Sequence, residues 1–171
     1  KISSLGIPII SEIEFAYHYC NSKKICVTGS NGKTTTTLLI THLLNNAGLS
    51  AKAVGNIGES YAMSVAIDPP DYQVIELSSF QLDFMFSFKA DIALLLNITP
   101  DHLDRYENSF DLYVNSKFRI TQNMTVNDHF IYNYDDPVIK EALAKRNLEC
   151  QTHPVSIFQK DGVDSWLDKE S

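Results

Sequence analysis

An α/β fold with a mostly parallel β-sheet, covered by helices on both faces, is the fold class that this sequence predicts. Short apolar runs alternate with helix-spaced segments along the chain, which is the pattern of strand–helix–strand units with right-handed crossovers. Residues 91–97 are an almost unbroken apolar run, as expected for a central parallel strand that is buried on both faces. A glycine-bracketed turn at residues 29–32 joins another apolar run to the start of a helix.

Length and composition indicate one globular domain. The chain has 171 residues, of which 44% are hydrophobic and 20% charged, enough to bury a core. The formal net charge of -7, without any Lys/Arg cluster, argues against nucleic acid as a partner. No apolar run approaches the ~18 residues of a membrane span and no signal peptide opens the chain, so we expect no membrane insertion and a cytoplasmic location. The 3 cysteines lack Cys-x-x-Cys spacing, which indicates neither a disulfide framework nor a zinc site.

The first segment, residues 1–23, predicts a short strand over 6–10 that leads into a helix. Ser11 and Glu14 have the spacing of a capping box, in which each side chain accepts a hydrogen bond from the backbone of the other residue. The chain opens without a clear start signal, so we expect this segment to be the end of a preceding unit.

Residues 24–37 have the most specific chemistry of the chain. A strand over 24–28 leads into a turn bracketed by Gly29 and Gly32, and a helix with Leu38, Leu39 and Leu43 at near-helical spacing follows, closed at residues 47–48. Glycines at the turn allow positive φ, so that consecutive backbone N–H groups can point at one anion. The helix start adds free N–H groups and the positive end of its dipole.

The residues after this turn favour phosphate binding. Lys33 would place its charge on the outer phosphates, and the Thr34 hydroxyl would be free to bind Mg²⁺. One glycine of the usual pattern is missing, because Val27 stands six residues before Lys33. The remaining Gly-x-x-Gly-Lys-Thr pattern also fits an ordinary strand-to-helix turn. Its place between a predicted strand and a predicted helix favours a phosphate loop.

The rest of the chain repeats the strand, loop and helix pattern. We expect strands over 51–54, 71–77, 91–97 and 130–133, and helices from 78, over 109–124 and over 140–146, with weak strand signals beyond. Polar segments follow the strand ends, at residues 29–34, 55–58, 76–81, 97–105 and 133–136. Because the carboxyl ends of parallel strands lie at one edge of a sheet, these segments should converge on one ligand site.

Several sequence blocks together resemble the central ATP-binding domain of the Mur ligases, which has a P-loop NTPase-like fold. The phosphate-loop block is shared by all Mur ligases and by folylpolyglutamate synthases, and the later blocks resemble the members that add D-glutamate. The resemblance covers about residues 6–136. The blocks are Gly29-Ser-Asn-Gly-Lys-Thr-Thr35, Gly55-Asn-Ile-Gly58, Glu76-Leu-Ser-Ser-Phe-Gln-Leu82, Leu96-Asn-Ile-Thr-Pro-Asp-His-Leu-Asp-Arg-Tyr106 and Tyr113-x-x-x-Lys-x-Arg119.

The resemblance implies a reaction and its partners. Such an ATP-dependent amide ligase moves the γ-phosphate of ATP onto the carboxylate of UDP-N-acetylmuramoyl-L-alanine, and the amine of D-glutamate attacks the acyl phosphate, in peptidoglycan precursor synthesis. ATP and Mg²⁺ are the implied cofactors, and a monomer is expected. Residues 1–20 would end an N-terminal UDP-binding domain and its linker, and residues 21–171 would be the central ATP-binding domain, incomplete at its C-terminal end. The chain alone is therefore expected to be inactive.

The resemblance also implies roles for individual residues. Oxygen ligands suit Mg²⁺, whereas histidine is a less expected ligand for it. The residues expected to bind the ATP phosphates are Gly29, Ser30, Asn31, Gly32, Lys33, Thr34 and Thr35. Those expected to act in catalysis are Lys33, His102 and Lys117, and those expected to contact the muramoyl substrate are Asn56, Ser79, Gln81 and Tyr113. The expected metal ligands are Thr34, Glu76, His102 and, as a carbamate, Lys117.

Lys117 lies on the apolar face of the predicted helix over 109–124. Phe110, Tyr113, Lys117, Ile120 and Met124 follow one another at spacings of three and four, which places them on one stripe. One interpretation is that the lysine packs its stem and reaches water or a carboxylate with its ammonium group. The other is that burial lowers its pKa and leaves a neutral amine able to add CO₂, which would give the carbamate that the resemblance implies.

Alternative interpretations exist for three of these residues and for the chain as a whole. Glu76 could be a solvated charge at the sheet edge, Asp101 could cap the following turn, and Arg105 could be an ordinary surface charge. The whole chain could come from another Mur ligase or a folylpolyglutamate synthase, or it could be a non-catalytic nucleotide-binding module. Residues 76–81 favour the ligase, because a nucleotide switch has no need of a segment that contacts a muramoyl group.

Overall fold

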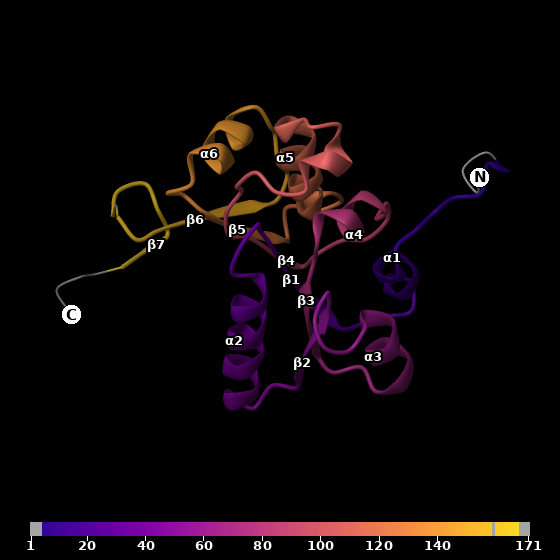
Figure 1. Cartoon of the computed structure of the whole chain (residues 1–171). Coiled ribbons are helices and arrows are strands. Elements are labelled where there is room, and N and C mark those ends of the chain that lie inside the picture. Colours follow the sequence, from indigo (N-terminus) through magenta and orange to yellow (C-terminus); the bar gives the residue numbers. More distant parts are fainter. Residues whose placement is uncertain (1–4, 159, 168–171) are drawn as a thin grey trace.

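The computed structural model, which describes residues 5–158 and 160–167, is built on a parallel β-sheet (Figure 1). Seven strands pair in the order β2-β3-β1-β4-β5-β6-β7, and every described pair is parallel. The predicted α/β fold is therefore confirmed. The strands are β1 (Lys23–Thr28), β2 (Ala51–Gly55), β3 (Tyr72–Glu76), β4 (Ile92–Leu95), β5 (His129–Asn133), β6 (Gln151–Ser156) and β7 (Ser165–Trp166).

The strand order reverses direction between β1 and β4. From β1 the chain moves outward to β2 and returns through β3, whereas from β4 it moves to β5, β6 and β7 on the other side. Neighbouring strands whose connections leave in opposite directions open a crevice at their carboxyl ends, and ligands of parallel sheets bind there. The loops after β1 and β4, which contain residues 29–32 and 96–102, lie at this point.

Helices cover both faces of the sheet, as predicted. On one face, Ile40 and Leu44 of α2 pack against Ile25, Val27 and Val74. The other face is covered by α1 and by α3 to α6, which join one large apolar cluster with the sheet (Figure 1). The helices are α1 (Glu12–Tyr17), α2 (Lys33–Asn46), α3 (Tyr61–Ile67), α4 (Ser79–Asp83), α5 (Phe110–Phe118) and α6 (Pro137–Ala144), with 3₁₀ turns η2 (Leu103–Tyr106) and η3 (Arg119–Thr121). Within the described ranges, none of these helices has the length and apolar character to cross a bilayer.

The predicted strand over residues 6–10 is wrong. Among the residues that the structure describes, no strand pairs with this segment, and the side chains of Ile7, Ile9 and Ile10 are exposed. None of the seven strands of the sheet contains residues 6–10, and Figure 1 shows the segment running away from the sheet toward the N-terminus. Residues 1–4 and 168–171 of the two predicted domain parts lie outside the described residues.

The predicted capping box at the start of α1 is only half formed. The Ser11 hydroxyl accepts a hydrogen bond from the Glu14 amide at 3.1 Å, as predicted. The Glu14 carboxylate, however, turns away from Ser11 and accepts the backbone N–H groups of Phe86, Ser87 and Phe88 at 2.8 to 3.0 Å. Glu14 is 3% exposed, and these contacts join α1 to the loop after α4.

Two other helix boundaries differ from the prediction. The helix expected over 109–124 ends as an α-helix at Phe118 and continues as the 3₁₀ turn Arg119–Thr121. The Arg119 side chain donates to the backbone carbonyls of Leu82 and Met85. Ile120 stays buried, so the apolar stripe persists although the helix does not. Helix α6 begins at Pro137, before the predicted residue 140, because Asp136 caps its first N–H groups. Helix α3 was not predicted.

Candidate active site

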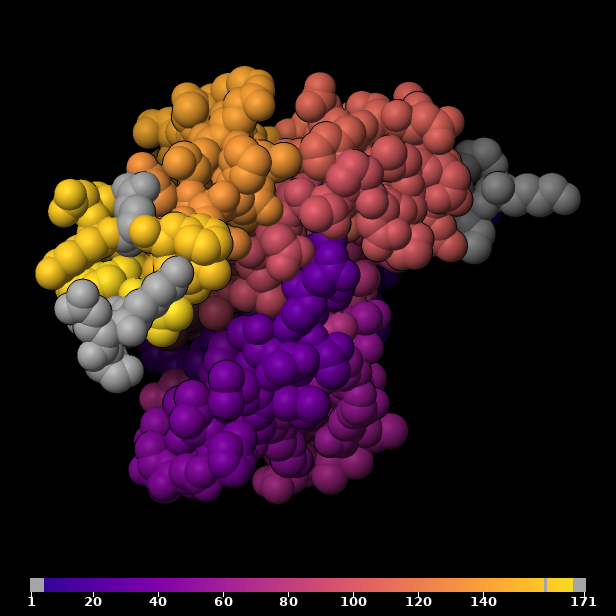
Figure 2. Space-filling model, turned by 60° about the vertical axis from the view of Figure 1, so that its left-hand side comes forward, coloured from indigo at the N-terminus to yellow at the C-terminus, as the bar shows by residue number. Residues whose placement is uncertain are grey.

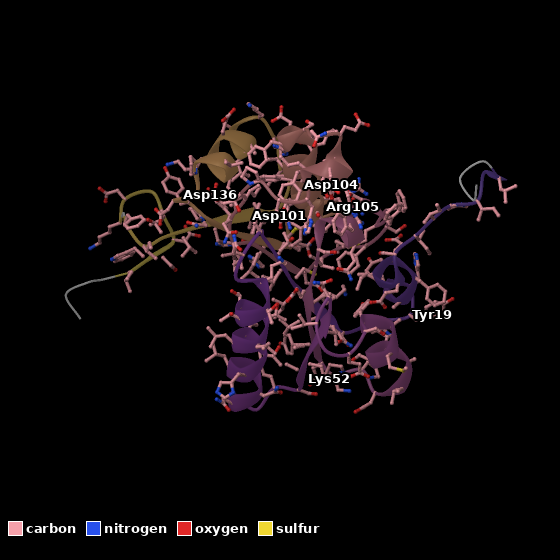
Figure 3. The ribbon with its side chains drawn as sticks, viewed as in Figure 1. Tyr19, Lys52, Asp101, Asp104, Arg105 and Asp136 are labelled. Carbon is pink, nitrogen blue, oxygen red and sulfur yellow. The ribbon has the colours of Figure 1, made fainter. Side chains whose placement is uncertain are left out.

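The polar segments after the strands lie along one edge of the sheet. Figure 3 shows Asp101, Asp104, Arg105 and Asp136 along the edge where α2 begins, while Lys52, near the amino end of β2, lies at the opposite edge. This is the edge formed by the carboxyl ends of the strands, at the reversal between β1 and β4. The geometry therefore brings the predicted segments to one place.

The turn after β1 has the backbone geometry that a phosphate loop requires. Gly32 has a φ of 81°, which favours glycine, and it is the N-cap of α2 without any side-chain cap. Gly29 passes so close to the segment after β4 that a Cβ there would lie 3.1 Å from the Cβ of Leu96. The first described intrahelical bond at this end is from the Thr36 amide to the Gly32 carbonyl, at 3.0 Å. The earlier N–H groups of α2 have no acceptor within the helix and can point at an anion.

Lys33 folds back over this turn. Its Nζ donates to the carbonyl oxygens of Gly29 and Ser30, both at 3.0 Å, so its positive charge lies directly above the loop. Thr35 follows on the first turn of α2. A phosphate seated on the N-terminus of α2 would meet this ammonium group.

The backbone amides of Ser30 and Asn31, which were expected to bind phosphate, donate to Asn97 instead. The Ser30 amide donates to the Asn97 carbonyl at 3.0 Å, and the Asn31 amide donates to the Asn97 side-chain oxygen at 2.8 Å. These two N–H groups therefore do not point at the anion position. Asn97 was not among the predicted site residues. The signal that could have found it is a carboxamide placed directly after the apolar strand that pairs with β1.

Glu76 is brought to the start of α2, which favours a ligand role over a solvated edge charge. It ends β3, its residue is 2% exposed, and its Oε2 accepts the Thr34 hydroxyl at 2.7 Å. Its Oε1 accepts the Asn56 amide at 3.0 Å, so both carboxylate oxygens are held. A buried carboxylate beside a hydroxyl is a set of hard oxygen donors, which fits Mg²⁺.

Lys117 is buried beside the same loop. Its residue is 2% exposed, and its Nζ donates to the Gly29 carbonyl at 2.8 Å and lies 3.5 Å from the Thr28 hydroxyl. None of the ion pairs found among the described residues includes it, so the interpretation of an ammonium group in water or on a carboxylate is not supported. Burial lowers the pKa of Lys117 to about 7, with a further contribution from the charge of Lys33.

The predicted substrate-contacting residues after β3 and on α5 differ in accessibility. Gln81 is half-buried, and its Oε1 accepts the Ser78 amide and hydroxyl, both at 3.0 Å, which completes a capping box. Ser79 is 3% exposed. Tyr113 is 1% exposed, and its hydroxyl lies 3.2 Å from the hydroxyl of Ser30. Tyr113 thus contacts Ser30 of the phosphate loop from helix α5.

His102 has different neighbours from the other predicted metal ligands. It adopts a left-handed backbone with a φ of 49°, and its side chain is exposed beside Asp101, at 3.5 Å, and the ring of Phe80. No hydrogen bond or ion pair within the described ranges joins it to Glu76 or Thr34. Nor do those ranges contain a group of three or more His, Cys, Asp or Glu residues able to hold a metal. A metal here would depend on oxygen atoms of a phosphate for its remaining ligands.

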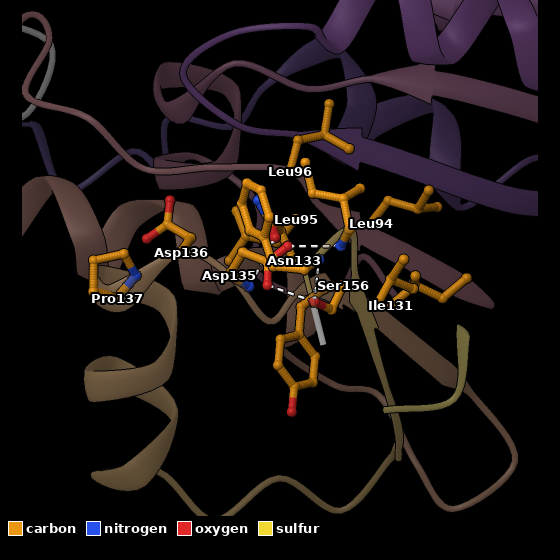
Figure 4. Close-up of a pocket in the computed structure, with 13 residues that line it drawn as sticks. Leu94, Leu95, Leu96, Ile131, Asn133, Asp135, Asp136, Pro137 and Ser156 are labelled. Atoms are coloured by element: carbon orange, nitrogen blue, oxygen red, sulfur yellow. Dashed lines mark hydrogen bonds between the residues drawn. The ribbon is translucent and has the colours of Figure 1, made fainter. Parts of the chain in front are cut away.

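An apolar cavity adjoins this edge and is lined in part by the predicted polar segment 133–136, but by none of the residues predicted to bind phosphate, metal or substrate. It has a volume of about 630 Å³ and is lined by residues of β4, β5, β6 and the segments after them (Figure 4). Asp135 in its wall accepts the Ser156 hydroxyl and the Ile157 amide, so its carboxylate is occupied. Leu96 connects the cavity to the phosphate loop, and Figure 2 shows the indigo surface at the start of α2 meeting the pink surface of the segment after β4.

Comparison with known proteins yields a family profile and similar sequences. The profile described as the Mur ligase middle domain matches residues 27–168. A protein of Bacteroides thetaiotaomicron named UDP-N-acetylmuramoylalanine--D-glutamate ligase is 52% identical over 168 residues, which are 98% of this chain and 38% of that protein. A protein of the same name from Porphyromonas gingivalis is 49% identical over 166 residues, 96% of this chain and 37% of that protein. The chain thus spans less than two fifths of the length of these relatives.

Solved structures share the fold. MurF ligase from Thermotoga maritima in complex with ADP superposes with a TM-score of 0.68 at 23% identity, over 92% of this chain and 37% of that one. Folylpolyglutamate synthase of Mycobacterium tuberculosis, complexed with ADP and AMPPCP, gives a TM-score of 0.62 at 14% identity, over 92% of this chain and 47% of that one.

Proposed function

The chain belongs to the Mur ligase family, as its middle domain, and on that premise we propose that it is the nucleotide-binding part of an ATP-dependent ligase that joins D-glutamate to UDP-N-acetylmuramoyl-L-alanine. The observation on which this rests is the bond between the Thr34 hydroxyl and Glu76, because it unites the start of α2 with the end of β3 beside Lys33. The 52% identity to a D-glutamate ligase favours this member over another Mur ligase, a folylpolyglutamate synthase or a non-catalytic module.

The proposed reaction has two steps. A carboxylate oxygen of the muramoyl substrate takes the γ-phosphoryl group of ATP, which gives an acyl phosphate and ADP. The amine of D-glutamate then attacks the acyl carbon, loses a proton and expels phosphate, so that an amide forms. Positioning and charge neutralisation are the main contributions of the protein to such phosphoryl transfer.

The chain's own residues would divide this work at the sheet edge. The N–H groups from Gly32 to Thr35 would bind the phosphates, with Lys33 neutralising the outer ones, and Gly29 would let the loop approach Leu96. Thr34 and Glu76 would hold Mg²⁺, with His102 as a further ligand or catalytic group. Bound Mg²⁺ would neutralise negative charge on the phosphates.

Lys117 would supply an additional anionic ligand as a carbamate. Its neutral amine adds to the carbon of CO₂, a nitrogen–carbon bond forms, and one proton passes to the solvent. Support comes from the burial of the amine and from its lowered pKa of about 7, which leaves much of it uncharged near neutral pH. Lys117→Ala in the whole enzyme should lose activity, and short-chain carboxylic acids should partly restore it. Full activity without added acid would contradict this role.

The remaining site residues and the setting are predictions that follow from the family. Asn56, Ser79, Gln81 and Tyr113 would contact or support the muramoyl substrate, and of the last three only Gln81 is half-buried rather than buried. Residues 1–20 would end a UDP-binding domain, and residues 21–171 would form most of the ATP-binding domain. A cytoplasmic, monomeric enzyme is part of the same proposal.

Phosphate release by the whole protein tests the proposed function. With Mg·ATP, release should require both UDP-N-acetylmuramoyl-L-alanine and D-glutamate, and Lys33→Ala should abolish it. Lys52→Ala is the matched control, because Lys52 lies at the opposite edge of the sheet (Figure 3). Release that does not depend on D-glutamate, or an active Lys33→Ala variant, would overturn the proposal.

A further inference from the structure

The pairing of β1 with β4 continues past the ends of both strands. The last strand pair is Thr28 with Leu95, and the Leu96 amide then donates to the Thr28 carbonyl at 3.0 Å. The Ser30 amide next donates to the Asn97 carbonyl, also at 3.0 Å. The start of the phosphate loop therefore pairs with the segment after β4 by the same kind of backbone hydrogen bond that joins the two strands.

The side chain of Asn97 adds a second row to this pairing. Its Oδ1 accepts the Asn31 amide at 2.8 Å, and its Nδ2 donates to the Asn31 carbonyl at 3.0 Å. A carboxamide offers an acceptor and a donor side by side, so it can copy the backbone of a neighbouring strand. Exchanging the oxygen and nitrogen of Asn97 would oppose like groups at both positions, so these bonds fix its orientation.

Ser30 fastens the loop once more. Its hydroxyl accepts the Thr99 amide at 2.9 Å and donates to the Thr99 carbonyl at 3.0 Å. Only backbone groups of Thr99 take part, and the Thr99 side chain is exposed. Residues 30 and 31 are thus held by residues 97 and 99, whereas the N–H groups of residues 32–35 have no acceptor among the described residues and can bind an anion.

We propose that Asn97 is a positioning residue of the phosphate loop, which holds Asn31 so that the start of α2 presents its N–H groups to the nucleotide phosphates. The role rests on the proposed function, since it assumes that phosphates bind there. Both polar ends of its carboxamide bond to Asn31, so the proposed role acts through the loop and requires no contact between Asn97 and the phosphates. Its effect is on the shape of the turn after β1.

Amide hydrogen exchange, measured on this chain by NMR, tests the positioning directly. Asn97→Leu keeps the size of the side chain and removes both bonds, so exchange at the Asn31 amide should accelerate by about tenfold or more. Thr99→Val is the matched control and should leave that exchange unchanged. The Leu77 amide, which donates to the Val27 carbonyl at 2.9 Å in the sheet, reports whether the fold survives. Asn97→Ala serves as the second variant if the leucine disturbs packing.

Titration with Mg·ADP tests the consequence. The affinity of Asn97→Leu should fall about tenfold relative to the wild-type chain, and that of Thr99→Val should not change. Unaltered Asn31 exchange in both Asn97 variants, or equal ADP affinity of wild type and Asn97→Leu, would overturn the positioning role. Absence of ADP binding by the wild-type chain, with Asn31 still protected, would instead overturn the proposed function on which the role rests.

Discussion

Replacing Lys117 by methionine should make the folded chain more stable. Methionine has a similar length and no charge, and it adapts to irregular packing. The lysine it replaces is 2% exposed, and burial lowers its pKa to about 7 from an ordinary 10.5. Holding this lysine in the core therefore opposes folding, as expected where a site is shaped for function rather than stability.

The size of the effect follows from the pKa gap. The difference between 10.5 and about 7 corresponds to roughly 4 to 5 kcal/mol of destabilisation near neutral pH. Loss of the hydrogen bond to the Gly29 carbonyl offsets about 1 kcal/mol of this, although Lys33 still donates to that carbonyl. We expect Lys117→Met to raise the free energy of unfolding by about 3 to 4 kcal/mol at pH 7.

The same pKa gap makes the stability of the wild-type protein depend on pH. Between about pH 7 and 10.5 the unfolded chain holds a proton on Lys117 that the folded chain has lost, so the wild-type protein gains stability as the pH rises. From pH 7.5 to 9 this gain is about 2 kcal/mol, and Lys117→Met lacks it. The advantage of the variant should therefore shrink with rising pH.

Urea denaturation of both proteins in CO₂-free buffer measures this difference, since a carbamate would replace the amine. Lys52→Met, at a partly exposed lysine on the opposite edge, is the matched control. A less stable Lys117→Met, or a stability difference that stays constant from about pH 7 to 9, would refute the desolvated amine.

Two further changes test other parts of the structure. Burial alone would raise the pKa of Glu14, but the backbone N–H groups that it accepts hold this pKa below its ordinary 4.5. Glu14→Gln should therefore lower the free energy of unfolding by about 2 to 3 kcal/mol at pH 7. The stabilisation by the Glu14 carboxylate is complete above pH 4.5 and is lost as the pH falls through the lowered pKa, so the stability difference measured by urea denaturation should close in acid. A difference that stays the same down to about pH 3 would show that the carboxylate is not responsible. Gly29→Ala should weaken Mg·ADP binding in calorimetry, because its Cβ would lie 3.1 Å from that of Leu96, whereas Gly162→Ala, with positive φ and open space, should not; equal affinities would contradict the close approach.

The fold could be predicted because its signals are local. The apolar run over 91–97 indicated a strand buried on both faces, and β4 is a central strand with Ala93 and Leu95 fully buried. The segment 6–10 is equally apolar but found no strand partner, since strand pairing depends on distant residues. The local sequence also did not predict which face of α2 packs against the sheet. Leu38, Leu39 and Leu43 are exposed, because the sheet contacts the face that carries Ile40 and Leu44.

The site was predictable to the extent that its chemistry follows strand ends. Thr34 and Glu76 meet because β1 and β3 are parallel neighbours. The alternating pattern implied a parallel sheet, but not this strand order. Asn97 was missed because its partner, Asn31, lies 66 residues away and uses only backbone groups. The resemblance implied that Tyr113 contacts the substrate, which stays a prediction. The contact of its hydroxyl with that of Ser30 was not predicted, because only the packing of α5 reveals it.

Titration of Mg·ADP into this chain, followed by the amide resonances of the phosphate loop, tests the central claim most directly. Binding should be weak, because the family resemblance places the adenine contacts and the D-glutamate domain outside this chain. The shifts should concentrate on residues 32–35 at the start of α2, and Lys33→Ala should remove them while Lys52→Ala keeps them. Shifts on another surface, or unchanged binding by Lys33→Ala, would contradict a phosphate loop at the reversal between β1 and β4.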